Sequence, residues 1–321
     1  MVRVAAYQPG IYPRSEGVVA ATRGLERGRT SPDDVTSAFR ADLSELVDVQ
    51  REAGLDIFSD GLLRWQDIFR PLVEASPGMD ARTLVRWFDN NSFFRAPEVT
   101  GPISMAGSLP AVLKDDDAVP APRVATLPSP YLFSRAAHTD LDRNTLMMDL
   151  TREILAPIAK SLAARGSTVV HLQEPWLAYF GIDKKEDWDD LEKALSELRD
   201  AVGGAAEIVL QTYYGDVGSV VDRLRSLPVD AVGIDFVQTD LGELGSNWDV
   251  GLFAGILDGR SSPVESAEGT AEFAVRAAEA LQPPALFLSA NCDLEFLPQE
   301  IARRKVLRLG ETAAIVKERL A

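Results

Sequence analysis

The chain has one cysteine and two histidines among its 321 residues, and this scarcity excludes several kinds of site. Because Cys292 has no second cysteine to pair with, an intrachain disulfide and a zinc site made only of cysteines are both excluded. Neither His138 nor His171 stands in a serine-protease or papain-like motif. We interpret His171 as a core residue or as a residue that supports a site from behind, because it lies within a predicted strand, and His138 as a surface or lid residue. Cys292 is either a small buried apolar side chain or a pocket thiol.

Long apolar runs and positive charge are also scarce. No stretch approaches the ~18 apolar residues of a membrane-spanning helix, and the first twelve residues lack the features of a signal peptide. The 33 Lys and Arg residues stand against 49 Asp and Glu residues, a net charge of −16 that disfavours nucleic acid and anionic membranes as partners. Dinucleotide-binding and P-loop spacings of glycine are missing. We therefore expect a cytoplasmic protein that acts on a small molecule.

What the sequence does contain is an alternation of short apolar runs with longer amphipathic stretches. Such runs are typical of parallel strands buried on both faces, and the stretches between them are typical of covering helices. Eight strands alternating with helices predict one α/β domain over residues 1–321, a (β/α)8 TIM barrel, with a doubly wound open sheet as the alternative. The predicted strands are residues 2–7, 55–59, 123–127, 168–172, 207–211, 231–235, 251–257 and 285–289.

The predicted helices are indicated by their ends as well as by their periodicity. Ser31 and Pro32 supply an N-cap and a first-turn proline for a helix that continues to Gly54. The other predicted helices span residues 141–165, 188–202, 217–227, 264–281 and 298–320.

Residues 71–122 depart from this alternation. They are too many for a simple connection, and the aromatic residues between Trp87 and Phe94 argue against disorder. We predict an ordered excursion over one barrel mouth, between the second and third strands. We interpret Asp115-Asp116-Asp117 within it as a solvated turn rather than a metal site.

Polar residues follow the predicted strands at the end where barrel enzymes carry their active sites. We expect Gln8, Asp60, Gln173, Gln211, Asp235, Arg260 and Cys292 to meet at one mouth. Arg64 and Arg260 are two guanidinium groups that can hold a carboxylate or phosphate. Asp60, Glu174 and Asp235 supply carboxylates for acid–base chemistry, and Tyr213 supplies a phenol.

Seven segments of the chain, in their order and spacing, resemble the cobalamin-independent methionine synthase family. The resemblance covers nearly the whole length and is strongest to the short, single-barrel members found in archaea and some bacteria. The matching segments are residues 54–67, 87–91, 127–131, 171–175, 210–216, 257–260 and 288–298.

Enzymes of that family transfer a methyl group from a methylated folate to the sulfur of homocysteine, which zinc binds as a thiolate. The resemblance implies that the family's zinc ligands, a His-x-Cys pair, a Glu and a second Cys, correspond to Gln211, Tyr213, Asp235 and Cys292. An amide and a phenol are poor zinc ligands, so we predict a degenerate site with Asp235 and Cys292 as its remaining ligands and much less than one equivalent of zinc.

The homocysteine pocket departs from the family in the same way. The two carboxylates that hold the substrate ammonium in the family correspond to Leu62 and Gln173, and the histidine near the leaving group corresponds to Arg260. A similar Thr-Tyr, Gly-Arg and Ser-Cys pattern occurs in the N-terminal barrel of the long two-barrel enzymes, which has lost its catalytic site. The resemblance therefore implies the fold more strongly than the reaction.

We accordingly expect a methyltransferase acting on a small thiol such as homocysteine, with a methylated folate or another donor, such as a methyl-donor protein, as co-substrate. The alternatives are a lyase or other enzyme whose small anionic substrate is held by arginines, and a non-catalytic binding protein. The candidate catalytic residues are Asp235, Arg260 and Cys292, and the candidate substrate-binding residues are Gln8, Asp60, Arg64, Gln173, Glu174, Gln211 and Tyr213.

Overall fold

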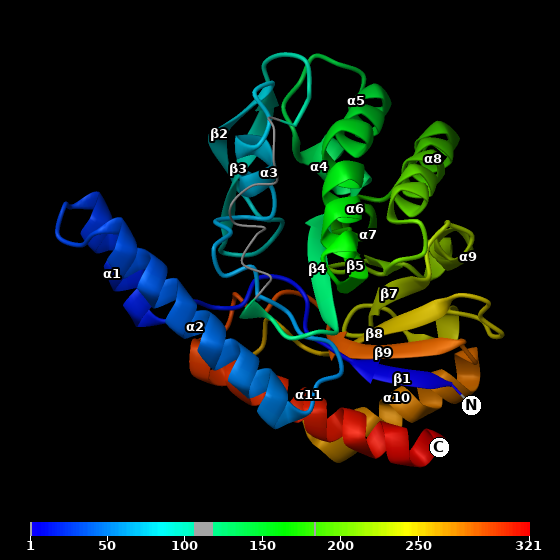
Figure 1. Cartoon of the computed structure of the whole chain (residues 1–321). Helices are drawn as coiled ribbons and strands as arrows, with labels where there is room; N and C mark the ends of the chain where they lie inside the picture. Colours follow the sequence, from blue (N-terminus) through cyan, green and yellow to red (C-terminus); the bar gives the residue numbers. More distant parts are fainter. Residues whose placement is uncertain (1, 106–117, 183) are drawn as a thin grey trace.

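A curled sheet of seven parallel strands forms the centre of the molecule, in the order β1-β9-β8-β7-β6-β5-β4 (Figure 1). The computed structural model describes residues 2–105, 118–182 and 184–321. The strands are β1 (Arg3–Ala6), β4 (Arg123–Pro128), β5 (Ser167–Gln173), β6 (Glu207–Gln211), β7 (Ala231–Asp235), β8 (Gly251–Leu257) and β9 (Ala285–Ala290).

The predicted strand over residues 55–59 is wrong as a regular strand, because only a single bridge forms there. Phe58 pairs with Arg123 at the start of β4, and the Asp56 N–H donates to the Ala6 carbonyl of β1 at 3.0 Å. The returning bond from the Ala6 N–H goes to the Asp56 carboxylate at 2.7 Å rather than to a main-chain carbonyl. This side-chain acceptor interrupts the ladder, yet residues 55–59 still connect the two edge strands.

The interior of the curled sheet is filled by side chains. The rings of Tyr7 and Phe253 lie 5.3 Å apart, and Phe287 and His171 pack edge-on against Tyr7. All four residues are at most 1% exposed. A filled interior leaves the ends of the strands as the place for chemistry.

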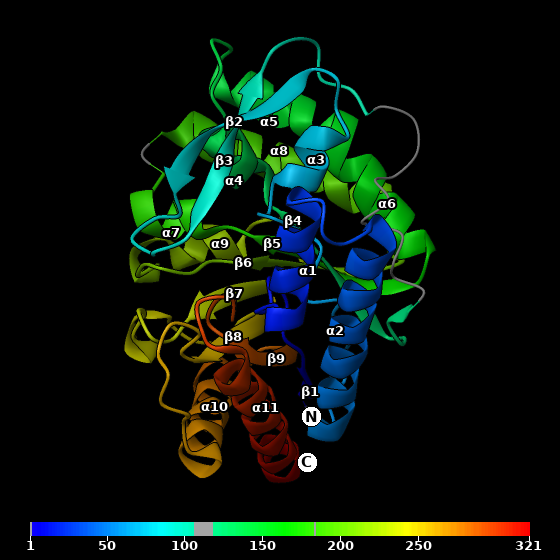
Figure 2. The same cartoon turned by 90° about the vertical axis from the view of Figure 1, so that its left-hand side faces the viewer.

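Helices cover the outside of the sheet. Helices α2, α10 and α11 pack together on one side, and α4, α5, α6 and α8 form a second group (Figures 1 and 2). None of the described helices is long and apolar enough to cross a membrane. The helices are α1 (Glu16–Glu26), α2 (Pro32–Ala53), α3 (Arg70–Glu74), α4 (Pro130–Ala136), α5 (Arg143–Leu150), α6 (Ala156–Ala164), α7 (Pro175–Phe180), α8 (Lys185–Val202), α9 (Val221–Arg225), α10 (Ala267–Leu281) and α11 (Gln299–Leu320), with short turns η2 (Thr151–Leu155), η3 (Gly218–Val220) and η4 (Leu241–Glu243).

The helix predicted over residues 141–165 is present with one irregular turn. Between α5 and α6 the π-helical turn η2 widens the backbone. Pro157 lies in the first turn of α6 and has no N–H to donate to the preceding turn. A wider turn accommodates this missing donor without ending the helix.

A two-stranded antiparallel hairpin, β2 (Met79–Arg86) with β3 (Phe93–Val99), occupies part of the 71–122 segment (Figure 2). Its tip contacts the turns that follow the sheet strands. Phe88 packs on Tyr214 after β6 with 5.6 Å between ring centroids, and Asp89 pairs with Arg260 after β8 at 3.0 Å. Asp115-Asp116-Asp117 lie outside the described residues.

Candidate functional site

The carboxyl ends of the parallel strands place a set of polar side chains next to one another. Gln173, Gln211 and Asp235 are the last residues of β5, β6 and β7, and each is at most 2% exposed. The strands end there because the residues that follow turn away from the sheet. Short parallel strands with a common register bring their final side chains to the same edge.

Gln211, Asn291 and Asp235 form a continuous hydrogen-bond network at this edge. The Gln211 side-chain N–H donates to the main-chain carbonyl of Asn291 at 2.8 Å, and the Asn291 side-chain N–H donates to Asp235 Oδ1 at 3.0 Å. Asp235 also accepts the N–H groups of Tyr214 at 3.1 Å and Val237 at 3.0 Å. Burial raises the pKa of Asp235, and these hydrogen bonds oppose that shift.

His171 contacts the network from the interior of the curled sheet. Its Nε2 lies 2.8 Å from Gln211 Oε1, and its Nδ1 lies 3.1 Å from the Tyr7 hydroxyl. Because the Gln211 amide nitrogen already donates to Asn291, the amide oxygen faces His171, which assigns the imidazole proton to Nε2. Burial lowers the pKa of His171 to about 4, so the imidazole is neutral near pH 7. His171 is thus both buried in the core and in contact with Gln211, which agrees with the two roles expected for it.

Cys292 is a free and buried thiol beside this network. Burial, with the charges of Asp293 and Asp235 next, raises its pKa well above the usual value. A Cβ atom added to Gly259 would lie 2.8 Å from its sulfur, so only glycine permits this close approach. Gln8 fixes the same turn, since its side-chain oxygen accepts the Ala290 N–H at 3.1 Å.

Asp293, Gln173 and Tyr213 form a second polar group. Gln173 donates to Asp293 Oδ1 at 2.5 Å and accepts from the Tyr213 hydroxyl at 3.2 Å. Burial raises the pKa of Asp293 to about 8, with Glu295 as the next cause. Gly10 has φ +81°, and a Cβ there would lie 1.7 Å from Asp293 Oδ1. Glycine is therefore required for the first loop to pass this carboxyl group.

Glu174 is held by the protein rather than directed at a pocket. Its carboxylate accepts the N–H of Leu177 at 2.8 Å, which caps α7, and the N–H of Leu132 at 2.9 Å in α4. The Ser129 hydroxyl donates to it as well. Burial raises the pKa of Glu174 to about 7 against these three bonds. One carboxylate thus caps two helices.

The two arginines predicted to hold an anion lie against different surfaces. Arg64 stacks on Phe39 of α2 at 5.4 Å, whereas Arg260 lies over the Tyr214 ring at 4.8 Å and pairs with Asp89. Arg64 therefore packs toward α2 and Arg260 toward the hairpin. These contacts do not support a common clamp.

Asp60 also lies apart from the network. Its carboxylate accepts the Leu62 N–H at 3.0 Å, and it lines a small cavity with Val119, Arg123 and Thr126. Neither Asp293 nor Glu295 lines that cavity. Asp60 follows the predicted second strand as expected, but its side chain faces a separate space.

The turn that carries Arg260 is anchored by a buried ion pair. Lys305 of α11 is fully buried at its side chain, and its ammonium contacts both Glu265 oxygens at 2.8 and 2.9 Å. Glu265 in turn accepts the Asp258 N–H at 2.8 Å, directly after β8. Neither residue was predicted from the sequence to act near the site.

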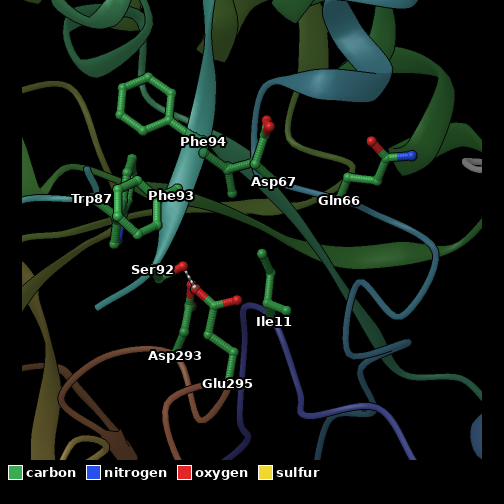
Figure 3. Close-up of a pocket in the computed structure, with 10 residues that line it drawn as sticks. Ile11, Gln66, Asp67, Trp87, Ser92, Phe93, Phe94, Asp293 and Glu295 are labelled. Atoms are coloured by element: carbon green, nitrogen blue, oxygen red, sulfur yellow. Dashed lines mark hydrogen bonds between the residues drawn. The ribbon is translucent and has the colours of Figure 1, made fainter. Parts of the chain in front are cut away.

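A cavity opens between the hairpin and the turn after β9 (Figure 3). The space in it that the centre of a water molecule can occupy is about 20 Å³, room for about one water. Glu295 accepts the Ser92 hydroxyl at 3.4 Å across the cavity, and burial raises the pKa of Glu295 as it does for Asp293. Glu295 was not predicted as a site residue; its alternation with Asp293 after Cys292 was the available signal. The lining residues are Ile11, Gln66, Asp67, Ile68, Trp87, Ser92, Phe93, Phe94, Asp293 and Glu295.

The four positions that the resemblance aligns with zinc ligands are engaged in protein contacts. Gln211 bonds to His171 and Asn291, and Tyr213 donates to Gln173. Both oxygens of Asp235 accept N–H groups, and the Cys292 thiol lies 3.6 Å from the Asp293 carbonyl oxygen. Within residues 2–105, 118–182 and 184–321, no group of three or more His, Cys, Asp or Glu side chains is placed to hold a metal ion.

Comparison with known proteins supports the family resemblance. Methionine synthases of Sulfolobus acidocaldarius and Saccharolobus solfataricus are 26% and 24% identical to it, over 97% of this chain and 91% and 94% of theirs. A B12-independent methionine synthase from a Shewanella species, in complex with selenomethionine, has the same fold with TM-score 0.77 at 20% identity, covering 100% of this chain and 99% of that one. A methyltransferase from Methanosarcina mazei gives TM-score 0.56 at 14% identity, covering 100% and 94%.

The family model described as the cobalamin-independent synthase N-terminal domain matches residues 75–273. That range includes the hairpin and the ends of β5, β6, β7 and β8. The resemblance inferred from the sequence is therefore confirmed, and the chain belongs to the cobalamin-independent methionine synthase family.

Proposed function

We propose that the protein is a methyltransferase that transfers a methyl group to a small thiol at the carboxyl edge of the sheet, without tightly bound zinc. Homocysteine is the acceptor suggested by the family, and a methylated folate or another methyl carrier is the donor. The observation that carries the proposal is the buried polar group at the family's site positions, in which Gln211 and Asp235 are joined through Asn291.

We also infer that residues 1–321 form one (β/α)8 barrel domain. Seven parallel strands are supplemented by residues 55–59, which bond to both edge strands. The hairpin is then an excursion over the mouth of that barrel, between its second and third strands.

The absence of tight zinc binding follows from the chemistry of the donors. Zinc prefers imidazole nitrogen and thiolate sulfur, and Gln211 and Tyr213 offer neither. The Asp235 oxygens already accept hydrogen bonds, and Cys292 holds its proton because burial raises its pKa. A metal ion would have to displace several protein hydrogen bonds to bind here.

In the proposed reaction a bond forms between the acceptor sulfur and the methyl carbon while the bond from that carbon to the donor breaks. The proton leaves the acceptor thiol and is taken up by the donor. We assign Asp235, Arg260 and Cys292 to the reacting end of the site. Gln8, Gln173, Gln211 and Tyr213 hold the turns around it through the bonds described above.

The test is methyl transfer from labelled methylfolate to homocysteine, measured with and without a zinc chelator, beside metal analysis of the purified protein. We expect activity that the chelator does not change, and zinc well below one equivalent. Asp235→Asn should lower the rate, whereas the exposed Asp249→Asn serves as the matched control. Chelator-resistant zinc at one equivalent, or no methyl transfer to any small thiol, would contradict the proposal.

A further inference from the structure

The turn directly after β8, residues 258–260, is held by hydrogen bonds on two sides. On one side the Gly259 N–H donates to the Asn291 side chain of the polar network at 2.8 Å. On the other side the Asp258 N–H donates to Glu265 at 2.8 Å. Because Glu265 stands at the far end of the same loop, just before α10, this second bond joins the two ends of the loop.

The turn brings two groups to the reacting end of the site. Arg260 lies over the Tyr214 ring at 4.8 Å and contacts Asp89 of the hairpin tip at 3.0 Å. Gly259 lies so close to the Cys292 sulfur that a Cβ atom there would come within 2.8 Å of it. Cys292 itself is 2% exposed. A displacement of the turn would therefore move Arg260 and uncover one side of the thiol.

A fully buried lysine supports the loop from α11. The Lys305 side chain is 0% exposed and lies on the buried face of α11 with Ala302 and Leu309, and its ammonium contacts both Glu265 oxygens. Replacing a buried ion pair by apolar side chains of similar size is often neutral or stabilising, so the pair is weak evidence for global stability. What the pair does provide is a fixed carboxylate with one oxygen toward the Asp258 N–H.

We propose that Lys305 and Glu265 are positioning residues for the reacting end of the site. The hydrogen bond from the Asp258 N–H to Glu265 holds the turn, and Lys305 is the counter-ion that keeps this buried acceptor in place. Both residues act through the turn, which keeps Arg260 over Tyr214 and covers the thiol. Their part in methyl transfer rests on the proposed function, whereas their hold on the turn does not.

The position of the turn can be measured at Cys292, because the chain has a single cysteine. The rate at which a maleimide modifies the thiol in the native protein reports how often local opening exposes it. After burial, the charges that contribute most to raising the Cys292 pKa are those of Asp293 and Asp235. Removing the ion pair of α11 therefore changes the labelling rate mainly through the turn.

The test compares two variants that both lack the ion pair. Lys305→Met/Glu265→Gln keeps an amide oxygen that can accept the Asp258 N–H, whereas Lys305→Met/Glu265→Met has a side chain of similar length without that oxygen. With the acceptor kept, Cys292 should be modified within about threefold of the parent rate. Without it, modification should be about tenfold faster or more, because a buried hydrogen bond is lost. Equal rates in the two variants would refute the proposal.

Controls separate a moved turn from a weakened fold. Urea unfolding is measured for both variants, and a labelling difference no larger than their difference in unfolding equilibrium would show a merely structural role and overturn the proposal. Arg303→Met/Glu52→Met removes an exposed ion pair of the same helix and should leave labelling unchanged. If the variant without the acceptor does not fold, Lys305→Met/Glu265→Leu makes the same comparison.

Catalysis gives a second and separate readout. In methyl transfer from labelled methylfolate to homocysteine, the variant without the acceptor should have a kcat about tenfold below that of the variant with it, and a smaller change in KM, because a displaced Arg260 no longer faces the reacting atoms. An equal kcat in the two variants would contradict the positioning role. A parent protein without methyl transfer would refute the proposed function, and the labelling rates, which need no substrate, would still decide the role of Lys305 and Glu265.

Discussion

Two neighbouring groups at the carboxyl edge of the sheet differ in how completely their polar atoms are paired. In the network of Gln211, Asn291 and Asp235, the donors and acceptors satisfy one another and reach down to His171 and Tyr7. In the cavity beside it, Asp293 and Glu295 each have one side-chain hydrogen-bond partner and face a space with room for about one water.

The difference indicates what each group can do. A fully paired network fixes geometry and resists a metal ion, because the ion must first displace existing hydrogen bonds from its ligands. The carboxyl groups in the cavity have interactions left to offer to a water molecule, so they are less constrained. The positions of the family's zinc site are thus the rigid part of this edge, and the residues directly after them are the less constrained part.

The largest expected effect comes from converting the paired network into a metal site. Gln211→His together with Tyr213→Cys would add an imidazole and a thiol next to Asp235 and Cys292. Zinc affinity should then rise by about 100-fold or more, because zinc binding strengthens with each strong ligand. Competition with a chromogenic chelator measures the change, and Gln238→His on the exposed loop after β7 is the control. Equal zinc affinity in the unmodified protein would show that the network is not closed to metal.

Breaking the network without replacing it should destabilise the protein. Asn291→Ala leaves the Gly259 N–H without its partner and removes one of the two donors to Asp235 Oδ1, the other being the Val237 N–H. We expect the free energy of unfolding to fall by about 1–3 kcal/mol, the cost of leaving one buried group unpaired. Urea unfolding measures it, with the exposed Gln238→Ala as control. A loss below that of the control would mean that the network is not structural.

The cavity should respond to charge removal in the opposite direction. The pKa of Asp293 is about 8 in the folded protein, above the ordinary carboxyl value near 4, so the folded state binds more protons between these limits. Stability conferred by this proton is lost as the pH rises, by at most about 1.4 kcal/mol per pH unit. The Asp293→Asn variant has no ionisable carboxyl group at this position, so it does not show this loss of stability.

Urea unfolding at several pH values should therefore show the Asp293→Asn variant gaining stability relative to the parent as the pH rises from 5 to 8. The raised pKa of Glu174 acts with the same sign in both proteins and cancels in the difference. A stability difference that is independent of pH would contradict the uncompensated charge.

The smallest effect concerns the hairpin that borders both groups. Arg260→Ala removes the ion pair with Asp89, whose side chains are 26% and 53% exposed, and the contact with Tyr214. A half-exposed pair contributes about 0.2–1 kcal/mol. We expect faster protease cleavage at the hairpin tip and little change in global unfolding. Arg303→Ala on α11, which breaks an exposed pair with Glu52 of α2, should leave that cleavage unchanged.

Much of the fold could be predicted because local chemistry determines it. The bounds of β6, β7 and β8 agree with the predicted strands, since each is a buried run followed by turn residues. Helix α2 begins at Ser31 with a capping box and ends at Gly54 in a left-handed conformation, as the sequence indicated. The hairpin was predicted only as an ordered excursion, because its strands are half exposed and pair only with each other.

The site could be predicted only in part. Strand ends identified Gln173, Gln211, Asp235 and Cys292 as neighbours, because parallel strands finish at one edge. Which of them bond depends on the curl of the sheet and on side-chain orientation, which no spacing encodes. His171 was expected in the core or behind a site because it lies inside a strand, and only the structure identifies Gln211 as the residue it contacts. Asp60 was expected at the same mouth, but its side chain faces another cavity.

The double cap made by Glu174 has a mechanical consequence for the mouth of the sheet. Because a single carboxylate fastens the first turns of α4 and α7, the loops after β4 and β5 behave as one rigid piece. A displacement of either loop, by a ligand or by another protein, therefore moves the other loop as well. A substitution at Ser129, which also donates to Glu174, should therefore change the positions of Tyr179 and Phe180, more than forty positions along the chain.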